Sequence, residues 1–179
     1  MRNMAWHPPL KYKFCLSSDG DSYKDMGEGV TAIPLVPHPG AFGVVRKHHI
    51  HEGVDLYCAD GDTVYAVEGG TVVTVIPFTG AKAGSDWWHD TDAVLVEGGS
   101  GVVVYGEIAT ALKTGDQVSA GGVIGQVKTV LKKDKGRPMA MLHLELHDKG
   151  ARDAPEWPVG TAKPETLRDP TPYLKGLVK

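Results

Sequence analysis

Short stretches of alternating hydrophobic and polar residues, most of them bounded by Gly or Asp, follow one another along most of the chain. β-Branched residues dominate these stretches, and no helical period of useful length interrupts them. The pattern predicts strands at residues 63–67, 71–76, 93–97, 102–108, 123–128 and 139–147. We therefore expect a mainly β fold, an antiparallel sandwich or half-barrel with a groove.

The chain divides into an arm and one domain. Residues 1–30 are polar and irregular, so we expect them to form an N-terminal arm packed on a single β domain that spans residues 31–179. The prolines in VTAIPLVPHPGAFG favour an edge or covering strand. An internal echo, GDTVYA and GDQVSA, predicts two similar β-units facing each other.

Composition and charge exclude several classes of partner. Hydrophobic residues make up 41% of the 179 residues and charged residues 23%, which argues against intrinsic disorder. The formal charge of -3 offers no basic surface to nucleic acid. No apolar run is long enough to cross a membrane, and the start of the chain lacks the apolar core of a signal peptide. We expect a monomer without a nucleic acid or membrane partner, and with Cys15 and Cys58 as free thiols or, alternatively, as a disulfide.

The stretch HIHEGVDL contains two candidate metal ligands, His51 and Asp55. On a straight strand these side chains would lie roughly 13 Å apart, so one ion could contact both only if the chain curls. We expect Gly53, which lies between them, to permit this curl by adopting a positive φ angle.

A second stretch, MLHLELH, can complete the site. By alternation its leucines face the core, while Met141, His143, Glu145 and His147 share the opposite face. Two imidazoles and a carboxylate are an ordinary ligand set for zinc, and three protein ligands leave a fourth position for water. One of these histidines together with the pair in HIHEGVDL therefore predicts a catalytic zinc site.

The order of these motifs resembles the lysostaphin-type (LytM-like) zinc metallopeptidases, a family of peptidoglycan endopeptidases. HEGVDL, VYAVEGGTVV, VVVYGE, GDQVSAGGVIGQV and LHLEL carry the resemblance over about residues 37–145, and DPTPYL resembles the usual family ending. The resemblance implies a lysostaphin-like fold of the barrel-sandwich hybrid type, with Zn²⁺ bound by His51, Asp55 and His143. It also implies hydrolysis of peptide bonds of bacterial peptidoglycan by a zinc-activated water, and a location that is usually periplasmic or secreted.

Two departures from the family pattern bear on catalysis. The family usually has histidine where this chain has Glu107, and His-x-His where this chain has Met141-Leu142-His143. In the family, those two histidines handle the proton of the metal-bound water and stabilise the tetrahedral intermediate. We assign Glu107 as the candidate general base, with a structural carboxylate as the alternative, and Tyr105 as a possible oxyanion donor. Met141 cannot transfer a proton.

The other polar side chains of the two motifs receive secondary roles. We expect Glu145 to orient a ligand or anchor a loop, and His49 and His147 to face water.

Two other functions compete with hydrolysis. A zinc-containing peptidoglycan-binding, peptide-binding or regulatory module could keep the groove and lose turnover, as the substitutions at Glu107 and Met141 suggest. A biotinyl or lipoyl carrier domain would need a lysine at a hairpin tip, and neither Gly69-Gly70 nor Gly121-Gly122 has one beside it.

Overall fold

Strands dominate the secondary structure, as the alternation predicts. The computed structural model describes residues 5–19, 29–136 and 138–179. Helical structure in this part of the chain is confined to the 3-10 helix η2 (Ala81–Ala83) and to α1 (Thr171–Lys175). The strands are β1 (Lys13–Ser17), β2 (Val30–Pro34), β3 (Val54–Tyr57), β4 (Thr63–Tyr65), β5 (Gly70–Thr79), β6 (Thr91–Gly98), β7 (Gly101–Ala109), β8 (Gln117–Val118), β9 (Val123–Val127), β10 (Met141–His147) and β11 (Leu167–Arg168).

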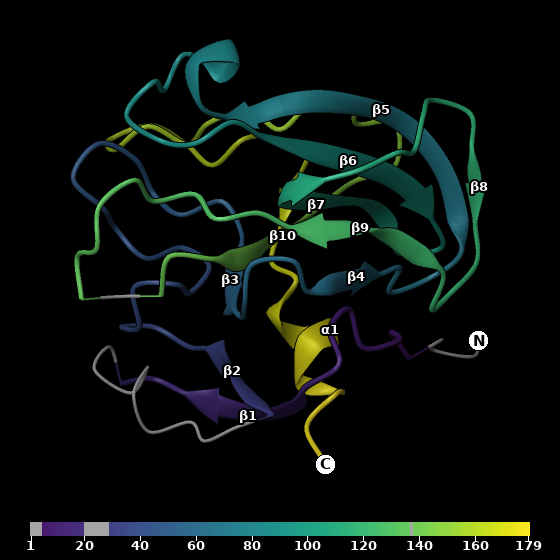
Figure 1. The fold of residues 1–179 in the computed structure, drawn as a ribbon, viewed down its shortest axis with the longest axis horizontal. Helices are drawn as coiled ribbons and strands as arrows, with labels where there is room; N and C mark the ends of the chain where they lie inside the picture. Colours follow the sequence, from purple (N-terminus) through teal and green to yellow (C-terminus); the bar gives the residue numbers. More distant parts are fainter. Residues whose placement is uncertain (1–4, 20–28, 137) are drawn as a thin grey trace.

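One large antiparallel sheet forms the body of the molecule (Figure 1). Its main path runs β11-β10-β7-β6-β5-β8, while β3 pairs with β10 and β9 joins β7 to β4. Every pairing within it is antiparallel. The path does not close into a barrel, and β1 and β2 form a separate parallel pair. The expected antiparallel β architecture is confirmed.

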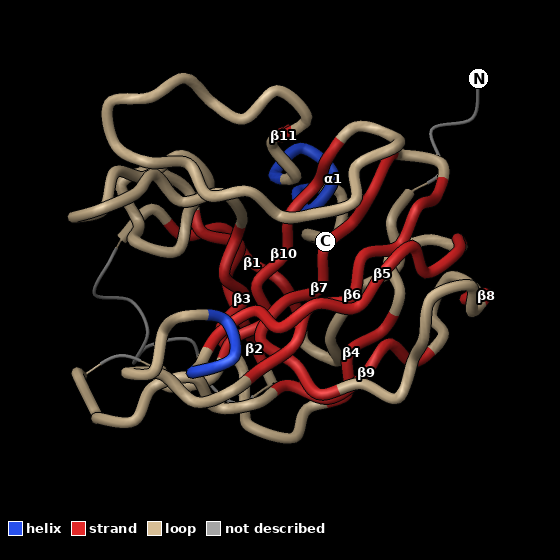
Figure 2. Tube along the Cα trace, turned by 90° about the horizontal axis from the view of Figure 1, so that it is seen from above, coloured by secondary structure: helices blue, strands red, loops and turns tan. Residues whose placement is uncertain are grey.

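Strand β10 lies at the centre of the core. Its leucines, Leu142, Leu144 and Leu146, are fully buried in the main hydrophobic cluster. One edge of β10 pairs with β7, and the other pairs first with β3 and then with β11. Figure 2 shows β3, β7 and β10 near the middle of the molecule, with long connections around them. The opposite face of β10 carries the residues that alternate with these leucines, among them His143, Glu145 and His147.

Residues 5–19 of the expected N-terminal arm pack on this core, and residues 1–4 and 20–28 of it lie outside the described residues. Trp6, Leu10 and Phe14 are buried, and the Trp6 ring stacks on Tyr173 of α1 at 4.8 Å between centroids. Both cysteines are free thiols, as expected. Within the described ranges no helix is long and apolar enough to span a bilayer.

Candidate metal centre

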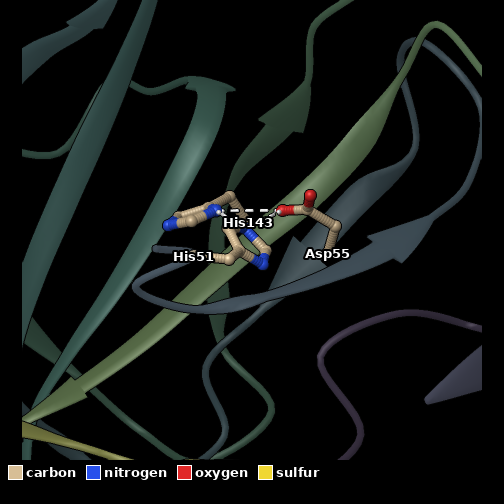
Figure 3. Close-up of side chains that lie close together, drawn as sticks. All are labelled: His51, Asp55 and His143. Carbon is tan, nitrogen blue, oxygen red and sulfur yellow. Dashed lines mark hydrogen bonds and ion pairs between the residues drawn. The ribbon is translucent and has the colours of Figure 1, made fainter. Parts of the chain in front are cut away.

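Three side chains from two segments meet at one point. Asp55 in β3 and His143 in β10 are opposite each other in register, and His51 reaches the same place from the segment before β3 (Figure 3). Asp55 Oδ1 lies 2.9 Å from His143 Nδ1 and 3.2 Å from His51 Nε2. The two imidazole nitrogens are 3.3 Å apart, and all three residues are buried. The geometry thus brings together the three residues that the resemblance implies as ligands.

The second nitrogen of each imidazole already has an acceptor. His51 Nδ1 donates to the carbonyl oxygen of Ala41 at 3.0 Å, and His143 Nε2 donates to Glu145 Oε2 at 2.7 Å. In neutral rings, His51 Nε2 and His143 Nδ1 then turn lone pairs toward each other and toward the carboxylate of Asp55. Converging lone pairs repel one another unless a cation lies between them. The donor set therefore fits Zn²⁺, which readily accepts imidazole nitrogen and carboxylate oxygen.

A proton can take the place of the cation in the metal-free protein. Burial alone would lower the pKa of His143, but hydrogen bonds with Asp55 and Glu145 outweigh burial and raise the pKa well above its ordinary value. Metal binding at these atoms therefore competes with protonation of His143.

Arg46 also contacts the site, although no sequence motif pointed to it. Its Nη2 donates to Asp55 Oδ2 at 3.0 Å and to the carbonyl oxygen of Pro39 at 2.8 Å. Burial would raise the pKa of Asp55, but the charge of His51, the hydrogen bond with His143 and the charge of Arg46 hold it well below its usual range. The carboxylate is ionised, and Arg46 occupies one oxygen while the other faces the histidines. In the sequence, the only feature that could have indicated this role is a positively charged residue nine positions before Asp55.

Gly53 acts differently from the expectation. It is not among the glycines with a positive φ angle, so the predicted left-handed curl is wrong. A Cβ at this position would instead lie 2.5 Å from the carbonyl oxygen of Leu144 and 2.9 Å from His143 Nε2. A glycine is needed because the chain between His51 and Asp55 packs directly against β10.

Glu107 lies at a bulge in β7. The register with β6 shifts by one residue between Tyr105 and Ile108, and Glu107 has a φ angle of 66°. A left-handed backbone costs a non-glycine residue on the order of 1 kcal/mol, and such strain is common at functional sites. The bulge directs Glu107 to the neighbourhood of Asp55 and His143, whose charges act on its carboxyl group.

The carboxyl group of Glu107 has an unusual environment. Its Oε2 is buried and has no hydrogen-bond partner within the described part of the chain. Burial, and next the charge of Asp55, raise the pKa of Glu107 to about 8. A buried, unpartnered carboxyl oxygen near the three candidate ligands is suited to exchange a proton with a group bound there.

Apolar side chains occupy the positions next to His143. Met141 is buried and precedes His143 on the same face of β10. The centroid of the Phe78 ring lies 5.1 Å from that of the His143 ring. Gly106 packs against the Phe78 ring, and a Cβ at position 106 would lie 2.8 Å from Phe78 Cε2. Neither Met141 nor Phe78 can exchange a proton, so any acid–base chemistry here would require ionisable neighbours such as Glu107.

Tyr105 does not lie at the site. It is fully buried in the main core, where its hydroxyl accepts a hydrogen bond from the Val67 N–H at 2.9 Å. Its hydroxyl therefore cannot serve as the oxyanion donor that was considered for it.

The remaining polar residues of the two motifs are all engaged. Glu145 Oε2 accepts a hydrogen bond from His143 Nε2. The expectation that His147 faces water is wrong, because His147 is completely buried with its Nε2 2.9 Å from Glu145 Oε1. His49 is partly exposed and lies 3.0 Å from Glu52 Oε1. The alternation along the strand predicts that His143, Glu145 and His147 share one face. It does not predict that this face is buried by other parts of the chain.

Several solved structures are similar to this chain. The catalytic domain of the antimicrobial peptidase lysostaphin from Staphylococcus simulans matches with a TM-score of 0.51 and 19% identity, over 89% of this chain and 99% of that domain. Lysostaphin in solution gives 0.48 and 22% identity, over 72% of this chain and 44% of that one. A zinc-containing peptidase from Vibrio cholerae has a TM-score of 0.42 and 19% identity, and the match covers 64% of this chain and 31% of that one. The chain spans about half or less of several longer structures that it matches.

The similarity to the lysostaphin catalytic domain confirms the lysostaphin-like fold. No curated protein sequence matches the chain. The sequence profile described as Peptidase family M23 matches residues 49–155, which is more than half of the chain and contains His51, Asp55, Glu107 and His143. The chain belongs to peptidase family M23.

Proposed function

We propose that the chain is a zinc-dependent endopeptidase domain that hydrolyses peptide bonds of bacterial peptidoglycan. The observation that carries this proposal is the convergence of His51, Asp55 and His143, whose ligand atoms all lie within 4.8 Å of one another. Among the described residues this group has three members, which leaves coordination positions for water and substrate. Membership of a peptidase family supports a peptide as the substrate.

In this proposal the chain supplies the ligands and the proton transfers. His51, Asp55 and His143 would hold Zn²⁺, which would supply Lewis-acid chemistry and a lowered pKa of water when bound. Glu107 accepts a proton at its carboxylate as water adds to the carbonyl carbon, and returns it to the nitrogen of the leaving amine as the C–N bond breaks. A pKa near the working pH suits a group that must both accept and return a proton.

A second candidate is a binding module without turnover. It is favoured by the apolar environment of His143, where Met141 and Phe78 lie next to the expected ligand. The same three ligands would then hold zinc, and the metal would bind a peptide carbonyl of the cell wall without cleaving it.

Digestion of purified peptidoglycan separates the two candidates. The zinc-loaded protein is compared with Glu107→Gln and with Glu165→Gln, which changes an exposed glutamate in the same way. We expect Glu107→Gln to lower kcat by ~10²–10⁴-fold with zinc content unchanged, because it removes the base and keeps the shape of the side chain. Equal rates in all three proteins would remove Glu107 from the mechanism. A wild-type protein that binds zinc and wall peptides but cleaves nothing at any pH would support the binding module.

A further inference from the structure

A chain of hydrogen bonds runs from the candidate metal centre along one face of β10. His143 Nε2 lies 2.7 Å from Glu145 Oε2, and the other oxygen of Glu145 lies 2.9 Å from His147 Nε2. His147 Nδ1 lies 2.9 Å from the hydroxyl of Thr166, just before β11. The three members on β10 are 4%, 2% and 0% exposed, so water does not compete for these contacts.

The chemistry of the members fixes the direction of the hydrogen bonds. Each carboxylate oxygen of Glu145 lies within hydrogen-bond distance of an imidazole Nε2, Oε2 with His143 and Oε1 with His147. An ionised carboxylate can only accept hydrogen bonds, so both histidines present a protonated Nε2 to it. In neutral rings each Nδ1 then carries a lone pair. His147 Nδ1 accepts from the Thr166 hydroxyl, and His143 Nδ1 faces Asp55 and His51.

We propose that Glu145 and His147 are positioning residues, which hold His143 in the tautomer and orientation that offer Nδ1 to the metal. The inference rests on the metal site of the proposed function and extends it by two residues outside the group of three candidate ligands. His147 is needed because Glu145 has two oxygens, and a fixed donor on one of them keeps the other directed at His143. Thr166 ends the series of hydrogen bonds and fixes the ring of His147 in turn.

A purely structural role is the competing account, because the same contacts also join β10 to the segment before β11. The two accounts predict different effects when these hydrogen bonds are removed. Positioning predicts a change in metal affinity and in the geometry around the metal. A structural role predicts only a change in the stability of the metal-free protein.

The test uses the full chain and two metal probes. Zinc affinity is measured by competition with a chelator, the absorption spectrum of bound Co²⁺ reports ligand geometry, and unfolding of the metal-free protein reports stability. The variants are Glu145→Gln, His147→Leu and Thr166→Val. Their matched partners are His147→Gln, which keeps an N–H for Glu145, and Thr166→Ser, which keeps the hydroxyl.

We expect Glu145→Gln and His147→Leu to weaken zinc binding by ~10–100-fold and to shift the Co²⁺ spectrum. His147→Gln should recover most of the affinity, and Thr166→Val should lose several-fold while Thr166→Ser loses none. Wild-type affinity and an unchanged spectrum in every variant would overturn the inference, and would leave the proposed function standing if zinc still binds and peptide is cleaved. A wild-type protein that binds no metal would overturn both.

Discussion

The two sides of the candidate centre differ in how fully their side chains are supported. On the ligand side, each residue has a second partner that fixes it: Ala41 for His51, Arg46 for Asp55 and Glu145 for His143. The neighbouring residues Glu107, Met141 and Phe78, called the other side below, have less support: Glu107 has a buried oxygen without a partner in the described part of the chain and a strained backbone, and Met141 and Phe78 are apolar.

This difference separates metal binding from turnover. The ligand side keeps the donor set and the outer contacts that metal sites use to orient their ligands. The other side departs from the family pattern, and its one candidate base carries the strain and the shifted pKa. Substitutions on the ligand side should therefore act mainly on metal affinity, and substitutions on the other side mainly on kcat.

The largest effect on stability is expected from the titration of Glu107 in the metal-free protein. Its pKa is about 8 when folded and about 4.5 when unfolded, so between these values the folded state binds more protons and stability falls as pH rises. The free energy of unfolding of Glu107→Gln should exceed that of wild type by a gap that opens above about pH 4.5, growing by about 1.4 kcal/mol per pH unit until about pH 8.

Chemical denaturation of both proteins at several pH values measures this gap. Glu165→Gln, which makes the same change at an exposed position, is measured alongside as the matched control. A gap that stays constant across the range would mean that Glu107 lies in an ordinary solvated environment, and the contrast between the two sides would disappear.

The next effect concerns the close packing on the ligand side. Gly53→Ala places a Cβ against the carbonyl oxygen of Leu144 and against His143, so β3 and β10 must move apart. We expect a loss of roughly 1–3 kcal/mol in the free energy of unfolding, together with weaker zinc binding. Gly99→Ala is the control, since a Cβ there meets nothing within 4 Å. If both variants unfold at the wild-type denaturant concentration, the contact between Gly53 and β10 does not constrain the site.

The smallest expected effect concerns the apolar residue at position 141. Met141→His restores the residue usual in the family, on the same face of β10 as His143. We expect kcat to rise by about tenfold, below the usual contribution of an evolved acid or base, because the surroundings are built for a thioether. Met141→Leu should leave kcat unchanged. An unchanged kcat in Met141→His with zinc still bound would show that position 141 cannot reach the substrate.

Much of the fold follows from local sequence rules. The six predicted strands match β4 to β7, β9 and β10, because each combines alternation with a turn residue at its end. The echo between GDTVYA and GDQVSA reflects shared turn chemistry, since Gly61 and Gly115 both have positive φ angles. In both turns the aspartate side chain accepts from a backbone N–H three residues earlier.

The site was predicted less completely, and β7 shows why. Tyr105 and Glu107 have the same parity, so a regular strand would place both on one face. The bulge breaks this rule: Val103, Tyr105 and Ile108 all face the main core, and Glu107 lies near the ligands instead. A bulge depends on the pairing with neighbouring strands, which the local sequence of β7 does not specify.

Residues that support the ligands were the hardest to predict. Arg46 was not assigned, and His147 was expected to face water, because each acts through a contact with a residue that only the fold brings near. The resemblance in motif order implies the three candidate ligands, and the fold brings their side chains together.

Metal content tests the central claim most directly. The wild-type protein and Asp55→Ala are purified without added metal and analysed for elements, with His49→Ala as a control that changes a histidine outside the group of three ligands. The proposal predicts about one zinc per chain in wild type and in His49→Ala, and none in Asp55→Ala. Metal-free wild-type protein that also fails to take up added zinc, or zinc retained in full by Asp55→Ala, would contradict it.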